Sequence, residues 1–128
     1  MNAEQYKRSV RADRHAWRDE MPQKCMHCGR KFVGFRWPEI HEIERKSQAP
    51  LNWWHRCNGL VLCNPCHSEF GDARLWPHAR QLALKRRMDP THFDLKAWLQ
   101  IKPRPSTYVT EKEIDQWSNQ DSESVASR

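Results

Sequence analysis

Cys-Met-His-Cys at residues 25–28 and Cys-Asn-Pro-Cys at residues 63–66 are the two stretches that decide the fold of this chain. Each is a C-x-x-C motif, and two such motifs can supply the four thiolates of a closed tetrahedral zinc site. Thirty-four residues separate Cys28 from Cys63, more than the roughly 15–20 of a simple zinc ribbon. We therefore predict a structural zinc, with a long insert between the motifs, on one set of ligands: Cys25, Cys28, Cys63 and Cys66.

Length and composition limit the class of protein. The chain has 128 residues, 38% of them apolar, and its mean hydropathy is −1.01, so we expect one domain whose small core is helped by a structural metal. No signal peptide is visible, and no apolar run reaches the roughly eighteen residues that span a membrane. Five cysteines in this spacing favour metal thiolates in a reducing compartment over disulfides. We expect a cytoplasmic protein without membrane contact, in which Cys57 is a small buried hydrophobic residue.

Positive charge is concentrated in one segment. The net charge is +6. Residues 73–104 carry eight Lys or Arg against two Asp, whereas residues 105–128 carry two basic residues against five acidic ones. A basic run can be a solvated helix face, and it can also bind an anionic partner, most simply nucleic acid. We expect DNA as the partner, contacted from this segment by Arg80, Lys85, Arg86 and Arg87.

Periodicity and helix breakers predict a mixture of helices and strands. Tyr6, Val10 and Trp17 fall near one face of a helix over residues 3–20, which Pro22 should end. The expected strands and the next helix follow in chain order: strands at 32–35, 39–43 and 60–62, a polar loop over 44–58, and a helix over 65–74.

The C-terminal half is expected to be helical. Residues 75–101 predict two helices that Asp89-Pro90 separates, and residues 103–109 a linker. Thr110 and Glu113 form a capping-box motif for a helix over residues 111–118. The chain then divides into four parts: a basic N-terminal helix (1–22), a zinc-clasped core (23–74), a basic helical extension (75–117) and a disordered tail (118–128).

The order of these motifs resembles that of the HNH endonuclease family. Ile-His-Glu-Ile at residues 40–43 follows the first cysteine pair, and Asn58 lies five residues before Cys63, in a stretch that ends with Cys-x-x-Cys-His at His67. The match covers about residues 25–70, and the small size of the chain is similar to that of the HNH proteins of bacteriophages. The resemblance implies an α+β fold with a small zinc-clasped ββα-metal core and flanking helices.

The resemblance also implies a catalytic site for a divalent cation, Mg²⁺, Mn²⁺ or Ni²⁺. His67 takes the place of a metal ligand, and Asn58 the place of the residue that steadies the loop of the site. In one register His41 is the second ligand, and Glu42 stands where the family keeps its histidine base. In the other, His41 is the base and Glu42 helps to hold the cation. We favour the second, because Glu, with a pKa of about 4.3 against about 6.5 for His, is a poor base near neutral pH but a good ligand for hard cations.

By this resemblance, the chain is expected to hydrolyse DNA phosphodiester bonds as a metal-dependent endonuclease. Arg45, Lys46 and Arg56 would then grip the flanking phosphates. The alternative is a catalytically degenerate HNH zinc module that binds DNA or a phage partner, such as a packaging or replication protein, in the host cytoplasm.

Other readings of the motifs are less favoured or stay open. A thiol–disulfide oxidoreductase is disfavoured because no βαβ alternation accompanies the cysteine pairs, and no small-molecule substrate is expected. Trp53 and Trp54 are either core residues or residues that stack on bases.

Overall fold

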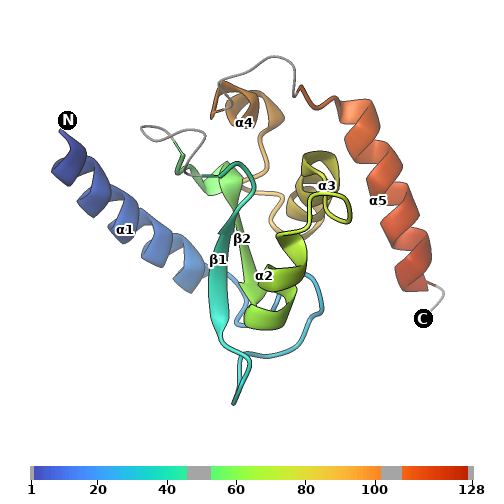
Figure 1. The fold of residues 1–128 in the computed structure, drawn as a ribbon, viewed down its shortest axis with the longest axis horizontal. Helices are drawn as coiled ribbons and strands as arrows, with labels where there is room; N and C mark the ends of the chain where they lie inside the picture. Colours follow the sequence, from blue (N-terminus) through green and yellow to red (C-terminus); the bar gives the residue numbers. More distant parts are fainter. Residues whose placement is uncertain (1, 46–52, 102–107, 127–128) are drawn as a thin grey trace.

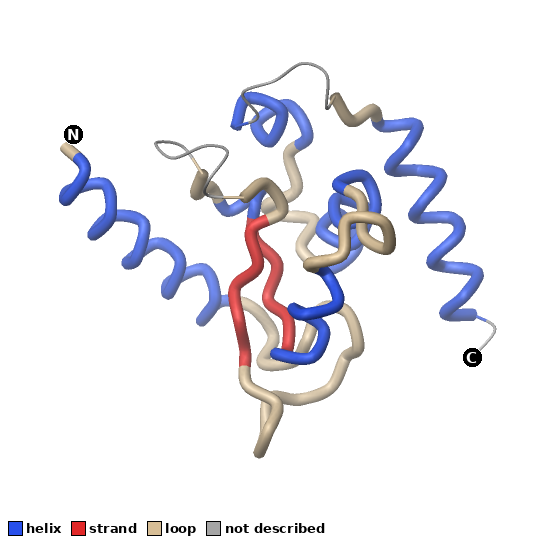
Figure 2. The backbone as a smooth tube through the Cα atoms, viewed as in Figure 1, coloured by secondary structure: helices blue, strands red, loops and turns tan. Residues whose placement is uncertain are grey.

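A two-stranded antiparallel sheet lies in the middle of the molecule, with helices around it (Figure 1). The computed structural model describes residues 2–45, 53–101 and 108–126, with side chains up to residue 122. The elements within these residues are, in order, α1 (Ala3–Glu20), β1 (Pro38–Glu42), the 3-10 turn η2 (Arg56–Asn58), β2 (Gly59–Cys63), α2 (Asn64–Phe70), α3 (His78–Met88), α4 (Leu95–Ile101) and α5 (Glu111–Ala126). The described chain is therefore mixed α+β, as the sequence predicts (Figure 2).

Helix α1 begins with a reciprocal cap. The Asn2 side chain accepts a hydrogen bond from the N–H of Gln5 (2.8 Å), and the Gln5 side chain accepts one from the N–H of Asn2 (2.9 Å). These bonds satisfy donors that the start of a helix leaves without partners. Val10 and Trp17, seven residues apart, are buried on one side of the helix. Because Pro22 follows its last turn, α1 ends where expected, and the predicted helix over residues 3–20 is confirmed.

The register of β1 and β2 sets which side chains share a face. Ile40 lies opposite Val61, and all of β2 is buried while β1 is half-buried. Side chains alternate along a strand, so Glu39 and His41 point to one face of β1, and Ile40 and Glu42 to the other. A hydrogen bond from α2 reaches the first face, and one from α1 reaches the second.

A buried lysine links α1, β2 and α3. The Lys85 ammonium donates to the Gly59 carbonyl (2.8 Å) and to the Asp89 carboxylate (2.7 Å), and Trp17 Nε1 donates to the same carboxylate (3.0 Å). Burial alone would raise the pKa of Asp89, but the charge and hydrogen bond of Lys85, with hydrogen bonds from Trp17 and His92, lower it below its usual value. A side chain at Gly59 would collide with the Trp17 ring, 3.0 Å from the position of a Cβ atom. The charged pair is thus part of the core.

Helix α5 packs along α3. Arg80 makes two hydrogen bonds to the Asp121 carboxylate, each of 3.1 Å, and Arg86 lies 2.8 Å from Asp115. Ile114 of α5 is completely buried. The acidic C-terminal segment therefore lies against the basic helix that precedes it.

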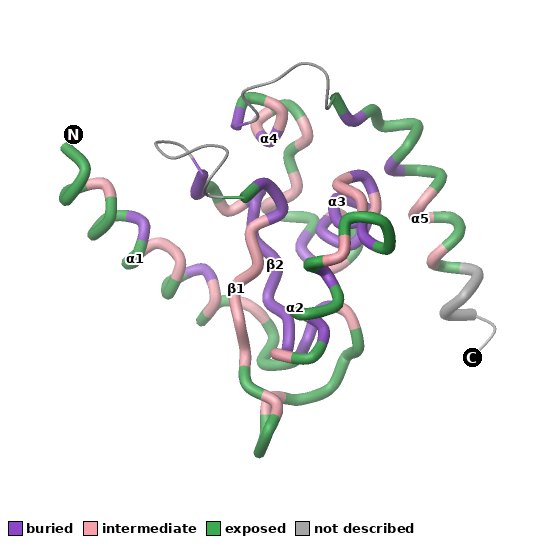
Figure 3. Tube along the Cα trace, viewed as in Figure 1, coloured by how far each residue is buried: buried purple, intermediate pink, exposed green. Residues whose placement is uncertain are grey.

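The core gathers around β2 (Figure 3). Trp17, Leu60 and Trp98 are completely buried, and Trp53 and Trp54 are 7% and 6% exposed. The last two are therefore core residues, and the alternative that they stack on bases is wrong. Across the described residues, every helix is too short or too polar to cross a bilayer.

Two predicted elements differ from the observed ones in the zinc-clasped region. Residues 32–35 do not form a strand; Gly34 has φ of 60° and the segment turns, with Val33 and Phe35 exposed. The predicted helix over 65–74 ends at Phe70. Residues 32–35 form no strand because they have no partner: among the described residues, the sheet consists of β1 and β2 alone.

The C-terminal helix is longer than predicted. Thr110 Oγ1 accepts a hydrogen bond from the N–H of Glu113 (3.2 Å), so the capping box is present. Helix α5 nevertheless continues to Ala126, through the segment expected to be a disordered tail, because packing on α3 adds stability that local propensity lacks. Residues 46–52 of the predicted loop lie outside the described residues, and its last three residues form the 3-10 turn η2. Of the predicted linker over 103–109, residues 103–107 lie outside the described residues as well.

Candidate functional site

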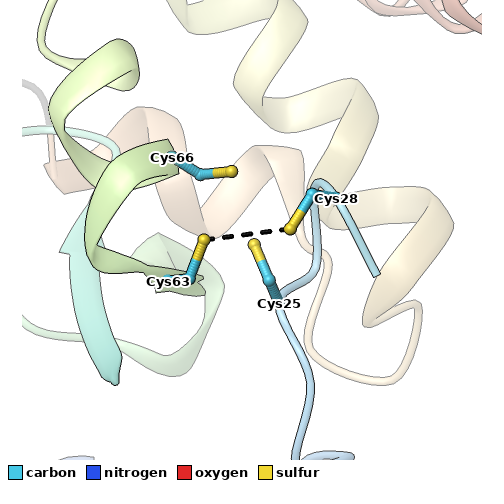
Figure 4. A group of neighbouring side chains, drawn as sticks. All are labelled: Cys25, Cys28, Cys63 and Cys66. Atoms are coloured by element: carbon cyan, nitrogen blue, oxygen red, sulfur yellow. Dashed lines mark hydrogen bonds between the residues drawn. The ribbon is translucent and has the colours of Figure 1, made fainter. Parts of the chain in front are cut away.

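Four cysteines form a compact cluster between the loop after α1 and the start of α2 (Figure 4). Their sulfur atoms all lie within 4.8 Å of one another, and the Sγ atoms of Cys28 and Cys63 are 3.8 Å apart. Cys25, Cys63 and Cys66 are buried, and Cys28 is exposed. The two C-x-x-C motifs therefore meet as the sequence predicts.

Local backbone geometry positions the first motif. Gly29, with φ of 75°, allows the tight turn after Cys28. The N–H of Met26 donates to the carbonyl of Val61 (3.0 Å), which attaches this turn to β2. Cys63 ends β2, so the strand itself delivers the second motif.

Three thiols of the cluster have shifted pKa values: burial raises the pKa of Cys25, burial and the neighbouring thiols raise that of Cys66, and the pKa of Cys63 is lowered. Burial alone would raise the pKa of the Cys63 thiol, but hydrogen bonds from Cys66 and Arg36 lower it to about 7. The Arg36 guanidinium donates to Cys63 Sγ over 3.3 Å. Because thiolates are the ligands that zinc selects in structural sites, these four residues fit a Zn²⁺ ion. They form a possible structural zinc site.

A second polar cluster lies where β1 meets α2. The imidazole rings of His41 and His67 have centroids 5.1 Å apart, at an interplanar angle of 77°. His67 Nδ1 lies 2.9 Å from Glu39 Oε2, and His41 Nε2 lies 2.7 Å from Gln81 Oε1. The structure therefore brings together the two predicted histidines, and adds two residues that the sequence interpretation missed, Glu39 and Gln81.

Hydrogen bonds determine which ring nitrogens are free to bind a metal. Gln81 Nε2 donates to the carbonyl of Trp76 (2.7 Å), so its oxygen faces His41 and the Nε2 of His41 carries the proton. Nδ1 of His41 then has a lone pair. His67 Nδ1–H donates to Glu39, which leaves the lone pair on Nε2 of His67. Burial lowers the pKa of His41 to about 4, although its bond to Gln81 acts in the opposite direction, so this imidazole is neutral at pH 7.

The histidine pair is more open than the cysteine cluster. In the described part of the chain, only the four cysteines bring three or more ligand atoms within 4.8 Å of one another. Two imidazoles alone leave coordination positions for water or substrate. A cation at His41 and His67 would thus be held by an incomplete protein shell.

Glu42 does not join this pair. It lies on the opposite face of β1, where its Oε1 accepts a hydrogen bond from Arg14 Nη2 (2.9 Å). The expectation that His41 and Glu42 hold one cation together is therefore wrong, since adjacent strand residues point to opposite faces. The same alternation, applied to the sequence, would have selected Glu39, two residues before His41.

Asn58 is a structural residue. Its side chain is completely buried. Oδ1 accepts from the N–H of Glu44 (2.8 Å) and from Trp98 Nε1 (2.9 Å), and Nδ2 donates to the carbonyls of Glu44 (3.0 Å) and Trp53 (2.7 Å). All four of its hydrogen-bonding positions are used. This agrees with a role in steadying the loop and leaves no free atom for a metal.

Most of the side chains predicted to contact DNA are buried or form ion pairs within the protein. Lys85 is completely buried, so its predicted contact with DNA is wrong. Arg80 and Arg86 pair with α5, as described above, and Arg56 pairs with Asp13 (3.0 Å) and Glu20 (2.9 Å). Two of the remaining predicted contacts, Arg45 and Arg87, are exposed. Lys46 lies outside the described residues.

A basic groove lies instead between α1 and β1. It has a volume of about 660 Å³, and Ile40 and Trp53 form part of its wall. The basic side chains that line it are Lys7, Arg11, Arg14, His15 and Arg18, and its described lining includes no acidic residue. The sequence feature that could have predicted this groove is the arginine repeat of the first helix. Counting net charge by segment missed it, because acidic residues of the same helix offset the arginines.

The comparisons with known proteins identify no family for this chain. No family model, no curated protein and no solved structure matches this chain. The similarity to HNH endonucleases therefore stands on the motif residues alone.

Proposed function

We propose that this chain is a metal-dependent endonuclease that hydrolyses DNA phosphodiester bonds. The observation that supports it best is the His41–His67 pair at the junction of β1 and α2, with ring centroids 5.1 Å apart. Two imidazoles, each held by a hydrogen bond through one ring nitrogen and each with the other ring nitrogen open, suit a divalent cation. The imidazole donors favour Ni²⁺ or Zn²⁺ over Mg²⁺ at this position.

The residues of the proposed site have separate roles. His41 and His67 hold the cation, and Gln81 and Glu39 keep their rings oriented. A divalent cation bound there would supply charge stabilisation to the phosphodiester and to its leaving oxygen. Asn58 fixes the loop that precedes β2. This assignment uses the first register, in which His41 is a ligand, and not the second one favoured from the sequence. Glu42, which would then stand in the place of the family's histidine base, lies on the other face of β1 with Arg14.

The groove between α1 and β1 supplies the affinity for DNA. Among the described residues, no acidic one is part of the lining of the groove. Arg14 is nevertheless paired with Glu42 (2.9 Å). Lys7 and Arg18 lie 3.8 Å from the exposed carboxylates of Glu4 and Asp19. Arg11 and these two loosely paired side chains are therefore the ones most open to phosphates. Such charges bind phosphates without regard to sequence and with a strong dependence on salt.

A plasmid-cleavage assay tests the proposal. Zinc-loaded protein is incubated with supercoiled plasmid and Ni²⁺, Mn²⁺ or Mg²⁺, beside the variants His41→Ala and His67→Ala. Loss of the cation site should reduce the cleavage rate by about 10²–10⁴-fold. Because neither ring is a core residue, zinc content and the circular-dichroism spectrum should stay unchanged.

The matched control is His55→Ala, which removes an exposed imidazole three residues before Asn58. This variant should cleave the plasmid at the rate of the unchanged protein. Cleavage that survives the double change His41→Ala/His67→Ala would come from a contaminant, and the proposal would fail.

A second function, DNA binding without cleavage, is favoured by one observation. Glu42 occupies the place where HNH proteins keep a histidine base, and Arg14 holds it in an ion pair. Unchanged protein that binds DNA but is inert with every metal would support this degenerate module. A gain of cleavage in Glu42→His would then identify the lost base as the cause.

A further inference from the structure

The loop between the first cysteine motif and β1 presents large apolar side chains to solvent. Phe35 is 93% exposed, Val33 70% and Trp37 52%. In the described residues these are three of the five exposed large hydrophobic side chains, and they fall within five positions. Leaving a side chain such as Phe in water forgoes the stabilisation that its burial would contribute. A local cluster of this kind marks an interaction site.

Hydrogen bonds fix both ends of this loop. Lys24 and Lys31 form a β-bridge at its base. The N–H of Trp37 donates to Asn64 Oδ1 (3.1 Å), and the N–H of Asn64 donates to the carbonyl of Trp37 (3.2 Å). Arg36 is held by Cys63 Sγ. The turn at Val33 and Phe35 therefore projects from two anchored ends, beyond the end of β1 (Figures 1 and 3).

The Lys, Arg, Asp and Glu residues of the segment that contains this turn are all basic. No acidic residue occurs between Glu20 and Glu39, whereas four basic residues do: Lys24, Arg30, Lys31 and Arg36. A protein partner would have to be acidic to match this surface, and the apolar tip would need a pocket. A nucleic acid matches both the charge and the apolar tip, because its backbone is anionic and its bases are flat and largely apolar.

We propose that Phe35 is a wedge that stacks on or between nucleic-acid bases, while the neighbouring Arg and Lys side chains contact the phosphates. Apolar side chains on a rigid projection insert between base steps in this way in other nucleic-acid-binding proteins. The inference identifies an interaction surface separate from the histidine pair and from the groove of α1. It relies on the proposed nuclease function only for the spacing between wedge and cut.

That spacing follows from β1. Phe35 lies six residues before His41, and β1 begins between them at Pro38, so the two residues are at most about 20 Å apart at roughly 3.3 Å per residue. One strand of a duplex rises about 3.4 Å per nucleotide, so the wedge is expected within about six nucleotides of a phosphate at the histidine pair.

Fluorescence with 2-aminopurine in a DNA duplex tests the wedge. Zinc-loaded full-length protein is added without other divalent cations, and the probe is moved along the duplex one position at a time. The unchanged protein should raise the fluorescence, because it unstacks the base, and Phe35→Ala should not. Phe35→Ala should also weaken binding by about 5- to 150-fold, as for the loss of one stacked base, without a change in the salt slope.

The matched control is Leu75→Ala, which removes another exposed apolar side chain, 51% exposed, from a different surface, and should behave as the unchanged protein. Equal DNA affinity of Phe35→Ala and the unchanged protein would overturn the wedge. So would a Phe35-dependent interaction with phosphatidylserine vesicles, or Phe35-dependent self-association in sedimentation, when DNA binding does not depend on Phe35. The expected fluorescence change, together with no cleavage in the plasmid assay with any of the three metals, would refute the nuclease and keep the wedge.

Discussion

The cysteine cluster and the histidine pair use the same short stretch of chain in different ways. Cys63 and Cys66 complete a set of four sulfur atoms within 4.8 Å, whereas His67, the next residue, faces His41 across an incomplete site. A complete tetrahedral set has no position for a substrate, and its binding energy stabilises the fold. An incomplete pair contributes little to folding but leaves positions at which a reaction can occur. In the proposed function, Cys63 and Cys66 therefore serve the structure and the adjacent His67 serves the chemistry.

The largest effect should follow from opening the cysteine cluster. Cys63→Ser should remove zinc and unfold the protein, since structural zinc contributes apparent binding energies on the order of 10 kcal/mol at pH 7. Elemental analysis and thermal denaturation measure both effects. Burial raises the pKa of the Cys57 thiol to about 11 and keeps it neutral, so the control Cys57→Ala should keep one zinc per chain. Well-folded protein without zinc would contradict the comparison.

Asn58 supports the loop at the open site without touching it. Asn58→Ala should lower the free energy of unfolding by about 2–5 kcal/mol, because it leaves buried backbone groups of the loop without partners, at roughly 1–3 kcal/mol each. Urea denaturation measures the loss, and zinc content should stay at one per chain. A change below about 0.5 kcal/mol would show that water replaces the amide.

Glu39 distinguishes a site that binds metal from a chance pair of histidines. Glu39→Gln weakens the orientation of His67, so the concentration of Ni²⁺ required for half-maximal cleavage should rise about 10- to 100-fold. The maximal rate should change less than this requirement. Glu42→Gln is the matched control on the opposite face of β1 and should leave the metal requirement unchanged. Equal shifts in both variants would mean that the carboxylates act only through overall charge.

The smallest expected effect compares two basic helices. Neutralising Lys7, Arg11 and Arg18 in α1 should reduce the slope of log K against log salt by about one for each phosphate contact removed. Neutralising Arg80 and Arg86 in α3 should leave the slope unchanged, because Asp121 and Asp115 already pair with them. Fluorescence anisotropy at several salt concentrations measures both slopes. A steeper loss in the α3 variant would show that α5 leaves that face when DNA binds.

Much of the fold could be predicted from the sequence because its signals are local. The helix over residues 3–20, the helix break at Asp89 and the capping box at Thr110 depend on neighbours a few positions away. The predicted strand at 32–35 failed because a strand also needs a partner, and its apolar residues remained exposed instead. The end of the last helix was wrong for a related reason, since contacts with α3 extend it.

The sequence by itself determined which four cysteines and which two histidines come together, because motif spacing is a property of the chain. Only the tertiary structure decided how these residues and the charges are used. Strand alternation placed His41 with Glu39 and turned Glu42 towards Arg14, and the packing of α5 neutralised Arg80 across 41 positions of sequence. Lys85 became a core residue for the same reason. Electrostatic partners act through distance in space, and a count of charges along the chain contains no information about that distance.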